Sequence, residues 1–327
     1  MSAVLTDFQK QLCNRLQRGL PIGAQPYAQI ATALGSTEEK VLAQTRELKQ
    51  AGIIRRIAAV INHRALGYSS TLVTAHVSED QIARATAAIN ALPGVSHNYL
   101  RRHRFNMWFT LQETSPAQIE RTLAELQASL GIEFHSLPVT RIFKLDVRFD
   151  AESDDDVLLQ DVERPPRAEP VELTDTQRQA LASLQGGLEV ISRPFDDIRP
   201  EGMSESDLFA TLNELLETGV IRRVGAVLNH HKLGFSANVM FAGQVDPEHV
   251  VEAGRWLAHS GTVSHCYERE TFPGWPYNLF AMLHGRAMAQ IQHTLDNLSA
   301  TGYVRTFELL PTQAELKKQP VRLSFPP

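Results

Sequence analysis

A stretch of eighteen residues that occurs twice constrains this chain more than any other feature. Residues 51–68 read AGIIRRIAAVINHRALGY and residues 218–235 read TGVIRRVGAVLNHHKLGF, with ten of the eighteen positions identical. Each copy pairs two arginines with a histidine seven residues later, His63 or His230. Packing alone does not require this spacing. The chain is therefore two copies of one unit, and function is expected in that unit and in the differences between the copies.

The residues before each block predict short helices. In the first copy Phe8, Leu12 and Leu16 share one helical face, and Pro26 opens a short helix ending at Gly35. Ser36 with Glu39 three residues later predicts a capping box that starts a third helix. The second copy predicts helices at 173–184, 194–198 and 204–217. Helices followed by a β-branched run, 53–61 in the first copy, are typical of a winged helix-turn-helix.

The residues after each block alternate between strand and helix patterns in the order βαββαβ. The first copy predicts elements at 70–77, 80–90, 95–100, 106–111, 116–130 and 133–137, and the second at 238–244, 247–259, 263–267, 277–283, 287–298 and 305–310. This order predicts a ferredoxin-like α+β sandwich in each copy.

The tandem duplication thus predicts four domains and a linker. They are a first helix-turn-helix with wing (1–68), a first ferredoxin-like domain (69–149), an acidic linker (150–170), a second helix-turn-helix with wing (171–235) and a second ferredoxin-like domain (236–327). The linker carries eight acids and two arginines, a net charge of −6 in a chain whose net charge is −5, so the remainder is close to neutral.

Composition predicts a soluble cytoplasmic protein that does not enter a membrane. No apolar run approaches the length that spans a bilayer, and we expect no secretory signal. Cys13 and Cys266 do not match each other in the repeats, so they are expected to be free thiols in a reducing compartment.

A helix-turn-helix followed by βαββαβ resembles the Lrp/AsnC regulators, which raises DNA binding as a hypothesis. Duplex recognition requires lysine and arginine near phosphates. The expected recognition helix of the second copy, SESDLFATLNELLE, has four acids and no lysine or arginine, and that of the first opens with Glu38 and Glu39. DNA binding is therefore not expected as the main function, and the helical fold is interpreted as scaffold.

The duplicated arginines and histidines are candidate substrate-binding residues: Arg55, Arg56 and His63 in the first copy, and Arg222, Arg223 and His230 in the second. Successive side chains of a strand point to opposite faces, so only one arginine of each pair can line a given pocket. The alternatives are that one arginine of each pair closes a salt bridge while the other extends its charged end into water, and that the histidines are solvated or cap a turn.

A second cluster, HNYLRRHRFNMW, combines cations and aromatic rings. Strand alternation places His97, Tyr99 and Arg101, with His103 beyond them, on one face. The cluster also supplies the candidate substrate-binding residues Arg102, Arg104, Asn106 and Trp108. Arginine binds carboxylates through two parallel hydrogen bonds and aromatic rings pack on planar ligands, so this surface suits a flat polyanion. The alternative is a basic hairpin exposed to water.

The second copy keeps part of this cluster and changes the rest. His265, Tyr267, Arg269 and Asn278 are retained, while Glu270 replaces Arg102. Four residues are inserted in the hairpin, with Trp275 among them, and His284 follows the next strand as a further candidate. The divergence indicates either two unequal sites or one working site with a degenerate partner. No phosphate-binding glycine loop, structural zinc pattern or nucleophile elbow is found, so no metal site is predicted.

The two motif blocks, RRIAAVINHRALGY with HNYLRRHRFNMWFTL and RRVGAVLNHHKLGF with HCYERETFPGWPYNLFAML, resemble the two subunit types of the sirohaem decarboxylases. These are Lrp/AsnC-like proteins of haem d1 biosynthesis, and the resemblance to their fused form covers essentially the whole chain. It implies loss of carbon dioxide from the C12 and C18 acetates of sirohaem to give 12,18-didecarboxysirohaem. No cofactor is implied beyond the substrate's own iron.

Under this resemblance we expect a histidine to supply the proton that replaces each carboxyl group. His97 or His103 would donate it in the first copy, with Arg101 orienting the substrate, and His265, Tyr267 and Arg269 would be the counterparts in the second. His63 and His230 are alternative donors or axial ligands to the substrate iron. A tetrapyrrole-responsive regulator and a non-catalytic tetrapyrrole carrier remain alternatives. An internal pseudo-dimer, a homo-oligomer and contacts with other haem d1 pathway enzymes are the expected associations.

Overall fold

The computed structural model describes residues 5–145, 148–152, 170–319 and 321. Their contacts form two compact units, each built from both copies of the repeat. The helical unit comprises residues 5–67, 148–152 and 170–235, and the barrel unit comprises residues 68–145, 236–319 and 321. Most of the predicted acidic linker, residues 153–169, lies outside the described residues.

The helical unit joins equivalent elements of the two repeats. The first repeat supplies α1 (Asp7–Arg18), α2 (Pro26–Ala33), α3 (Glu38–Gln50), β1 (Ile54–Ile61) and the short 3₁₀ helix η1 (His63–Leu66), and the second supplies α6 (Asp175–Leu184), α7 (Glu205–Glu217) and β6 (Ile221–Leu228). Strand β1 pairs antiparallel with β6, with Ile57 opposite Ala226. The β-branched run predicted as a wing strand therefore pairs with its equivalent in the other repeat.

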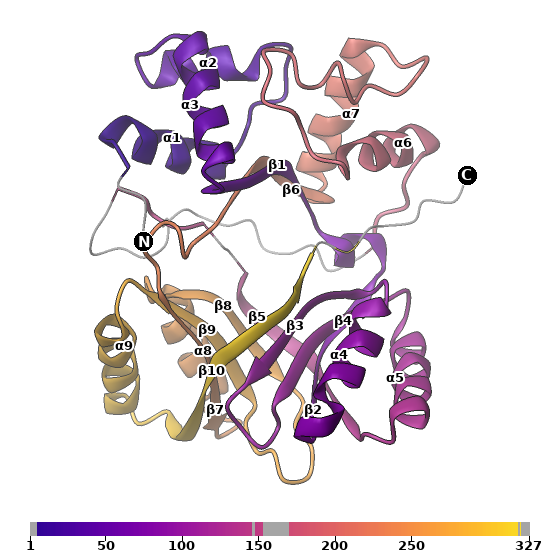
Figure 1. The fold of residues 1–327 in the computed structure, drawn as a ribbon, viewed down its shortest axis with the longest axis vertical. Coiled ribbons are helices and arrows are strands. Elements are labelled where there is room, and N and C mark those ends of the chain that lie inside the picture. The colour runs from indigo at the N-terminus through magenta and orange to yellow at the C-terminus, as the bar shows by residue number, and fades with distance from the viewer. Residues whose placement is uncertain (1–4, 146–147, 153–169, 320, 322–327) are drawn as a thin grey trace. The chain divides into compact units, whose positions relative to one another are not determined.

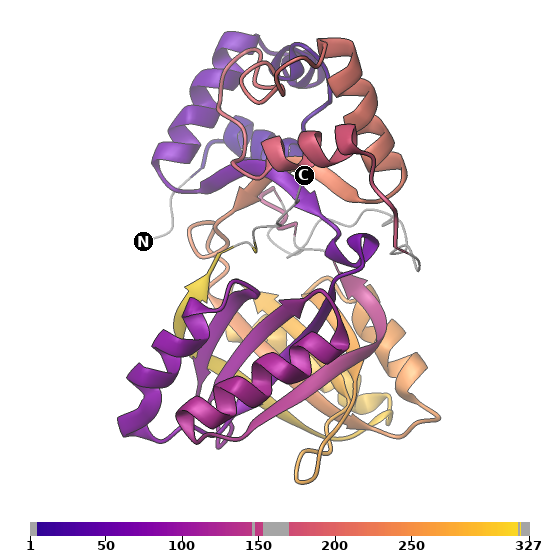
Figure 2. The ribbon, with the colours of Figure 1, turned by 90° about the vertical axis from the view of Figure 1, so that its right-hand side faces the viewer.

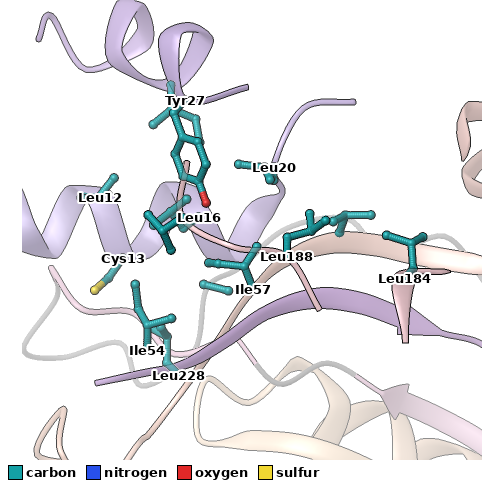
Figure 3. Close-up of a cluster of buried hydrophobic side chains, with 14 of the residues drawn as sticks. Leu12, Cys13, Leu16, Leu20, Tyr27, Ile54, Ile57, Leu184, Leu188 and Leu228 are labelled. Carbon is teal, nitrogen blue, oxygen red and sulfur yellow. The ribbon is translucent and has the colours of Figure 1, made fainter. Parts of the chain in front are cut away.

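One apolar core holds the helical unit together (Figure 3). Leu12 and Leu16 of α1 and Tyr27 of α2 belong to the same buried cluster as Leu184 and Leu188 of the second repeat. Complete burial of a leucine-sized side chain contributes roughly 1.5–3 kcal/mol. The helices of one repeat therefore bury their apolar faces partly against the other repeat.

Two predicted helix features in this unit are wrong. The N-cap of α3 is Thr37, whose side chain accepts from the Lys40 amide, rather than Ser36. This places two glutamates in the first turn, where the helix dipole favours them. The helix predicted at 194–198 is a series of turns, because a five-residue segment forms too few helical hydrogen bonds to offset the cost of nucleation.

The barrel unit contains both βαββαβ segments. The first runs β2 (Ser69–Ala75), η2 (Glu79–Gln81), α4 (Ile82–Ala91), β3 (Val95–Arg101), β4 (Met107–Glu113), α5 (Pro116–Leu130) and β5 (Phe134–Leu145), and the second β7 (Ala237–Val245), α8 (Val250–His259), β8 (Val263–Arg269), β9 (Leu279–Gly285), α9 (Met288–Ala300) and β10 (Val304–Lys318). Their strands close into one barrel in the order β10–β3–β4–β2–β5–β8–β9–β7. The helices lie on its outer surface, as Figures 1 and 2 show.

The last strand of each repeat is longer than predicted, which closes the barrel. We predicted strands at 133–137 and 305–310, but β5 continues to Leu145 and β10 to Lys318. The added residues of β5 pair with β8, and those of β10 pair with β3. These partners belong to the other repeat, so a pattern read within one repeat does not reveal them.

Side chains alternate between the helices outside the barrel and its interior. Two apolar clusters lie between the strands and their helices, one in each repeat. A separate cluster fills the interior from both repeats; its buried members are Trp108, Leu137, Met240, Ala242, Trp275, Phe280 and Leu310. The interior is therefore a packed core over part of its length. Among the described residues, no helix has the length and apolar character needed to cross a bilayer.

Both cysteines are free thiols, as predicted, and both are completely buried. Burial raises the pKa of the Cys13 thiol to about 12 and also raises that of Cys266. Because the thiolate is the reactive form, we expect a thiol reagent at neutral pH to modify the native protein on the order of a thousandfold more slowly than the unfolded chain. Mass spectrometry of timed reactions measures this, and rapid native labelling of both thiols would contradict the described burial.

Candidate functional site

A row of three side chains lines the inner face of β3. His97, Tyr99 and Arg101 alternate along the strand, and Tyr99 lies opposite Trp108 of the interior cluster. The His97 and Tyr99 rings stack with centroids 6.2 Å apart, and the Arg101 guanidinium lies 5.2 Å from the Tyr99 ring centroid. The predicted alternation therefore brings these three residues together.

Strand β8 carries the equivalent row. His265 and Tyr267 have ring centroids 6.0 Å apart, and the Arg269 guanidinium lies 4.9 Å from the Tyr267 ring centroid. Tyr267 lies opposite Phe280 of the interior cluster, so this row also faces inward. In the barrel order β3 and β8 are four strands apart in either direction. The two rows therefore occupy opposite walls of the barrel.

Each of the two arginines donates hydrogen bonds to a strand of the other repeat. Arg101 Nη1 donates to the Leu310 carbonyl at 2.6 Å and to Thr312 Oγ1 at 3.2 Å, both on β10. Arg269 Nη1 donates to the Leu137 carbonyl of β5 at 2.8 Å. Arg101 is 4% exposed and forms no ion pair among the described residues, and burial lowers its pKa to about 10. It is thus a buried cation at neutral pH.

The hairpin that follows β3 packs against the inserted loop of the second repeat. His103 lies past the end of the strand, its Nδ1 accepts from the Phe105 amide at 3.0 Å, and its ring meets Trp275 edge-on at 5.4 Å. Burial lowers the His103 pKa. Strand β3 ends at Arg101, and the His103 amide donates to the Arg101 carbonyl at 3.0 Å where the chain turns, so strand alternation does not extend to His103. Alternation predicted that His103 would continue the row of His97. In the structure the row ends at Arg101, and His103 is not part of it.

Two tryptophans that were predicted to contact a ligand are part of the interior core. Trp108 and Trp275 are each 1% exposed, and their ring centroids are 5.4 Å apart. Trp108 Nε1 donates to the Phe105 carbonyl at 2.7 Å. Arg104 is exposed, and its guanidinium donates to the Gly274 carbonyl in the inserted loop. These residues close one end of the barrel with aromatic side chains. Arg102, which is exposed, lies in the same hairpin.

The repeated asparagine connects each hairpin to a neighbouring strand end. Asn106 accepts from the Val77 amide at 2.9 Å and donates to the Val77 carbonyl at 2.8 Å. Asn278 does the same with Val245, at 3.0 and 2.9 Å. Both polar atoms of each side chain are thus used on the backbone, which explains why the repeat retains this residue.

Replacing Asn106 or Asn278 by alanine is therefore expected to destabilise the protein by about 1–3 kcal/mol, because one amide and one carbonyl lose their partner. Aspartate keeps the acceptor and loses the donor, so it should cost less than alanine. Urea unfolding monitored by circular dichroism measures the change. Asn297→Ala on the exposed face of α9 is the control, expected within about 0.5 kcal/mol of the parent; equal effects at all three positions would contradict the assignment.

The duplicated arginines belong to the helical unit. Arg55 is exposed, whereas Arg56, Arg222 and Arg223 are half-buried. Val60 lies opposite Arg223, and Arg56 is four residues before Val60 on β1, so Arg56 and Arg223 share one face of the two-stranded sheet. Burial, with a contribution from Arg55, lowers the pKa of Arg56. The pairing register shifts at Arg55 on β1 and at Arg222 on β6, so the strict alternation on which the prediction rested is interrupted at both arginine pairs.

The duplicated histidines occupy unequal environments. His63 begins η1 and is half-buried. His230 is only 5% exposed and stacks on Phe149, with ring centroids 5.2 Å apart. The Asn62 side chain donates to the Gly219 carbonyl at 3.2 Å, which ties the end of β1 to the second repeat. The exact recurrence of Asn-His is therefore partly a packing feature.

Serines beside the two row histidines were not among the predicted site residues. Ser96 Oγ lies 2.8 Å from His97 Nδ1, and Ser264 Oγ lies 2.8 Å from His265 Nδ1. Ser264 Oγ also lies 2.7 Å from Nε2 of His284, the further candidate, which is 5% exposed. The signal was present in the sequence, since both copies read Val-Ser-His at this point.

A small surface cavity of about 270 Å³ lies beside the β3 hairpin. Its lining residues are Glu79, Ile82, Leu100, Arg101, Arg102, His103, Asn106 and Gln313. Pockets for drug-sized ligands measure roughly 300–1,000 Å³, so this cavity does not admit a whole macrocycle. Within the described parts of the chain, no group of three or more His, Cys, Asp or Glu side chains is arranged to hold a metal ion.

Comparisons with known proteins place both units in one family. The AsnC-like ligand binding domain matches residues 65–144 and 232–317, and the siroheme decarboxylase NirDL-like HTH domain matches residues 9–55. Siroheme decarboxylase of Hydrogenobacter thermophilus is 34% identical over 98% of this chain and 95% of its own. The siroheme decarboxylase alpha subunit of Desulfovibrio desulfuricans is 38% identical over 46% of this chain and 88% of its own.

A solved structure is similar over nearly the whole chain. The crystal structure of the siroheme decarboxylase NirDL in co-complex with an iron-uroporphyrin III analogue superposes with a TM-score of 0.70 at 29% identity, covering 96% of this chain and 93% of that one. The similarity therefore includes both units and both repeats.

Proposed function

This chain belongs to the sirohaem decarboxylase family, and we propose that it removes carbon dioxide from the C12 and C18 acetates of sirohaem, giving 12,18-didecarboxysirohaem in haem d1 biosynthesis. It is then a carboxy-lyase. The observation that carries the proposal is the repeated His-x-Tyr-x-Arg row on the inner face of β3 and β8. Each row combines an aromatic ring, a cation and a titratable imidazole.

The two rows supply chemistry that suits a flat polycarboxylate. The buried, positively charged Arg101 attracts carboxylates toward its wall and holds the ring of Tyr99 in place. Arg269 does the same for Tyr267. Both arginines and both tyrosines belong to the proposed site, with the arginines acting mainly by positioning. The contacts of Trp108, Trp275, Asn106 and Asn278 favour support of the barrel over substrate binding.

When carbon dioxide leaves an acetate, an electron pair remains on the side-chain carbon and a proton must take its place. An imidazole titrates near neutral pH and can supply that proton. We propose His97 and His265 as the donors, because each lies half-buried on the inner face with Nδ1 beside a serine hydroxyl. His103 is the weaker candidate because it packs against Trp275.

The remaining predicted roles stay proposals. Arg55, Arg56, Arg222 and Arg223 would bind spectator carboxylates, as would the exposed Arg102 and Arg104, and His63 would be an alternative donor or an axial ligand to the substrate iron. The burial of His230 favours packing over iron ligation. No cofactor beyond the substrate's own iron is proposed.

We also propose that the chain is cytoplasmic and forms an internal pseudo-dimer of two fused subunits. Each half combines a winged helix-turn-helix (1–68 and 171–235) with a ferredoxin-like domain (69–149 and 236–327), joined by the linker at 150–170. The existence of relatives about half as long supports the fusion. Self-association and contact with other haem d1 pathway enzymes are further proposals.

A regulator that binds DNA is not favoured. The first turn of α3 carries Glu38 and Glu39, and that of α7 carries Glu205 and Asp207. Acids at these positions repel phosphate where a recognition helix would meet the groove.

The deciding experiment incubates the purified chain anaerobically with sirohaem and follows the tetrapyrrole by mass spectrometry. Loss of two carboxyl groups as carbon dioxide supports the proposed function. Binding of sirohaem without loss of mass would identify a non-catalytic carrier, and failure to bind it would exclude both.

A further inference from the structure

The two repeats differ in the group that stands behind the row histidine. In the second repeat Ser264 Oγ connects two imidazoles, at 2.8 Å from His265 Nδ1 and 2.7 Å from His284 Nε2. In the first repeat Ser96 Oγ connects an imidazole to a hydroxyl, at 2.8 Å from His97 Nδ1 and 2.8 Å from Thr110 Oγ1. The serine is common to both repeats, and its second partner is not.

The positions of these second partners correspond through the repeat. The backbone amide of His284 donates to the Thr262 carbonyl at 2.8 Å, as that of Gln112 donates to the Gly94 carbonyl at 2.9 Å. Position 284 in the second repeat is therefore position 112 in the first. His97 lies opposite Thr110 and His265 opposite Met282, so the hydroxyl of the first repeat is a thioether in the second.

A serine hydroxyl between two imidazoles couples their protons. The hydroxyl has one proton to donate, so it donates to one ring nitrogen and accepts from the other. If it donates to His265 Nδ1, then His265 carries its own proton on Nε2, and His284 donates from Nε2 to the serine oxygen. Ser264 is completely buried and His284 nearly so, so water does not replace this connection.

We propose that Ser264 and His284 are positioning residues that relay a proton to His265, and that the first repeat has no such relay. The inference rests on the proposed function. As the bond to the leaving carboxylate breaks, its electron pair stays on the side-chain carbon, which takes the proton from His265 Nε2. His265 Nδ1 takes the Ser264 hydroxyl proton, and the serine oxygen takes the Nε2 proton of protonated His284. His284 ends neutral, and His265 ends with its original charge.

The charged groups near the relay lie along its own strand or on the other face. Tyr267 and Arg269 follow His265 on the inner face of β8. Lys144 of β5 lies opposite Cys266, which faces α8, and its Nζ donates to the Ser260 carbonyl at 3.3 Å. On β7, His284 lies opposite the uncharged Asn238, and Arg286 lies in the turn that follows β9. Among the described residues, the Ser264 hydroxyl is thus the group that connects the His265 and His284 imidazoles by hydrogen bonds.

The first repeat supplies the substitution for the test. His284→Gln installs the residue that the first repeat has at this position, and Ser264→Ala removes the connection. Both should lower kcat by on the order of ten- to a hundredfold with KM nearly unchanged, as loss of an outer partner does. Ser264→Thr keeps a hydroxyl at this position and should therefore retain most of the parental rate. His293→Gln, on the exposed face of α9, is the control.

Two readouts distinguish a relay from a structural role. The rate in mixtures of light and heavy water should depend on deuterium content with curvature in the parent chain, because several protons move together, and linearly in His284→Gln. Nitrogen NMR of the substrate-free protein should show that Ser264→Ala changes the tautomer of His265. Unchanged kcat and isotope dependence in His284→Gln would overturn the relay.

The proposed function can fail separately from the relay. A parent chain that leaves sirohaem intact refutes the function, and the NMR comparison then still decides the coupling of the two imidazoles. An unchanged His265 spectrum in Ser264→Ala overturns that coupling whatever the activity.

Discussion

Replacing His97 or His265 by glutamine is expected to lower the rate of carbon dioxide release at the affected wall by roughly 10²–10⁴-fold. Glutamine retains hydrogen bonding but carries no proton that titrates near neutral pH. Both histidines lie half-buried on the inner face of the barrel with Nδ1 beside a serine. Substrate binding should change less than kcat, because the tyrosines and arginines of both rows remain.

Analysis of the tetrapyrrole products shows which of the two walls each variant affects. If each wall serves one acetate, either single variant should accumulate a tetrapyrrole that has lost one carboxyl group, and the double variant should produce neither product. His103→Gln is the internal comparison, expected to retain most of the rate because His103 belongs to the hairpin contact with Trp275. Parental rates in both His97→Gln and His265→Gln would refute the assignment of the proton donors.

Trp275→Ala is expected to destabilise the protein by about 3–5 kcal/mol, the range for removing a buried tryptophan. Trp275 is 1% exposed and contacts rings from both repeats, including Trp108 and Phe105 at centroid distances of 5.4 and 5.7 Å. Its removal leaves a cavity where the inserted loop closes the barrel end. Chemical unfolding followed by tryptophan fluorescence and circular dichroism measures the loss.

Two further variants separate packing from substrate contact. Trp275→Phe fills part of the cavity and should cost clearly less than alanine. Trp256→Ala, at a half-buried position of α8, should be the milder tryptophan deletion. If Trp275→Ala left stability unchanged but raised KM for sirohaem strongly, Trp275 would be a substrate contact as the sequence first suggested, and not part of the core.

The sequence by itself determined the repeat, the order of elements in each half and the inward row of each site. The row follows because strand alternation is a local property: His97, Tyr99 and Arg101 must share a face once β3 forms. The positions of the free thiols and the acidic first turns of α3 and α7 are equally local, because they depend on which residues occupy those positions and not on distant contacts. Family membership followed from motif blocks long enough to be specific.

Only the tertiary structure decided which residues meet across the repeats. The extensions of β5 and β10 find their partners in the other repeat, and β1 pairs with β6. The same distinction separates His97, whose ring stacks on Tyr99 within the row, from His103, which follows six residues later but packs on Trp275. Pairing and packing energies depend on neighbours distant in the chain, so local periodicity contains no record of them.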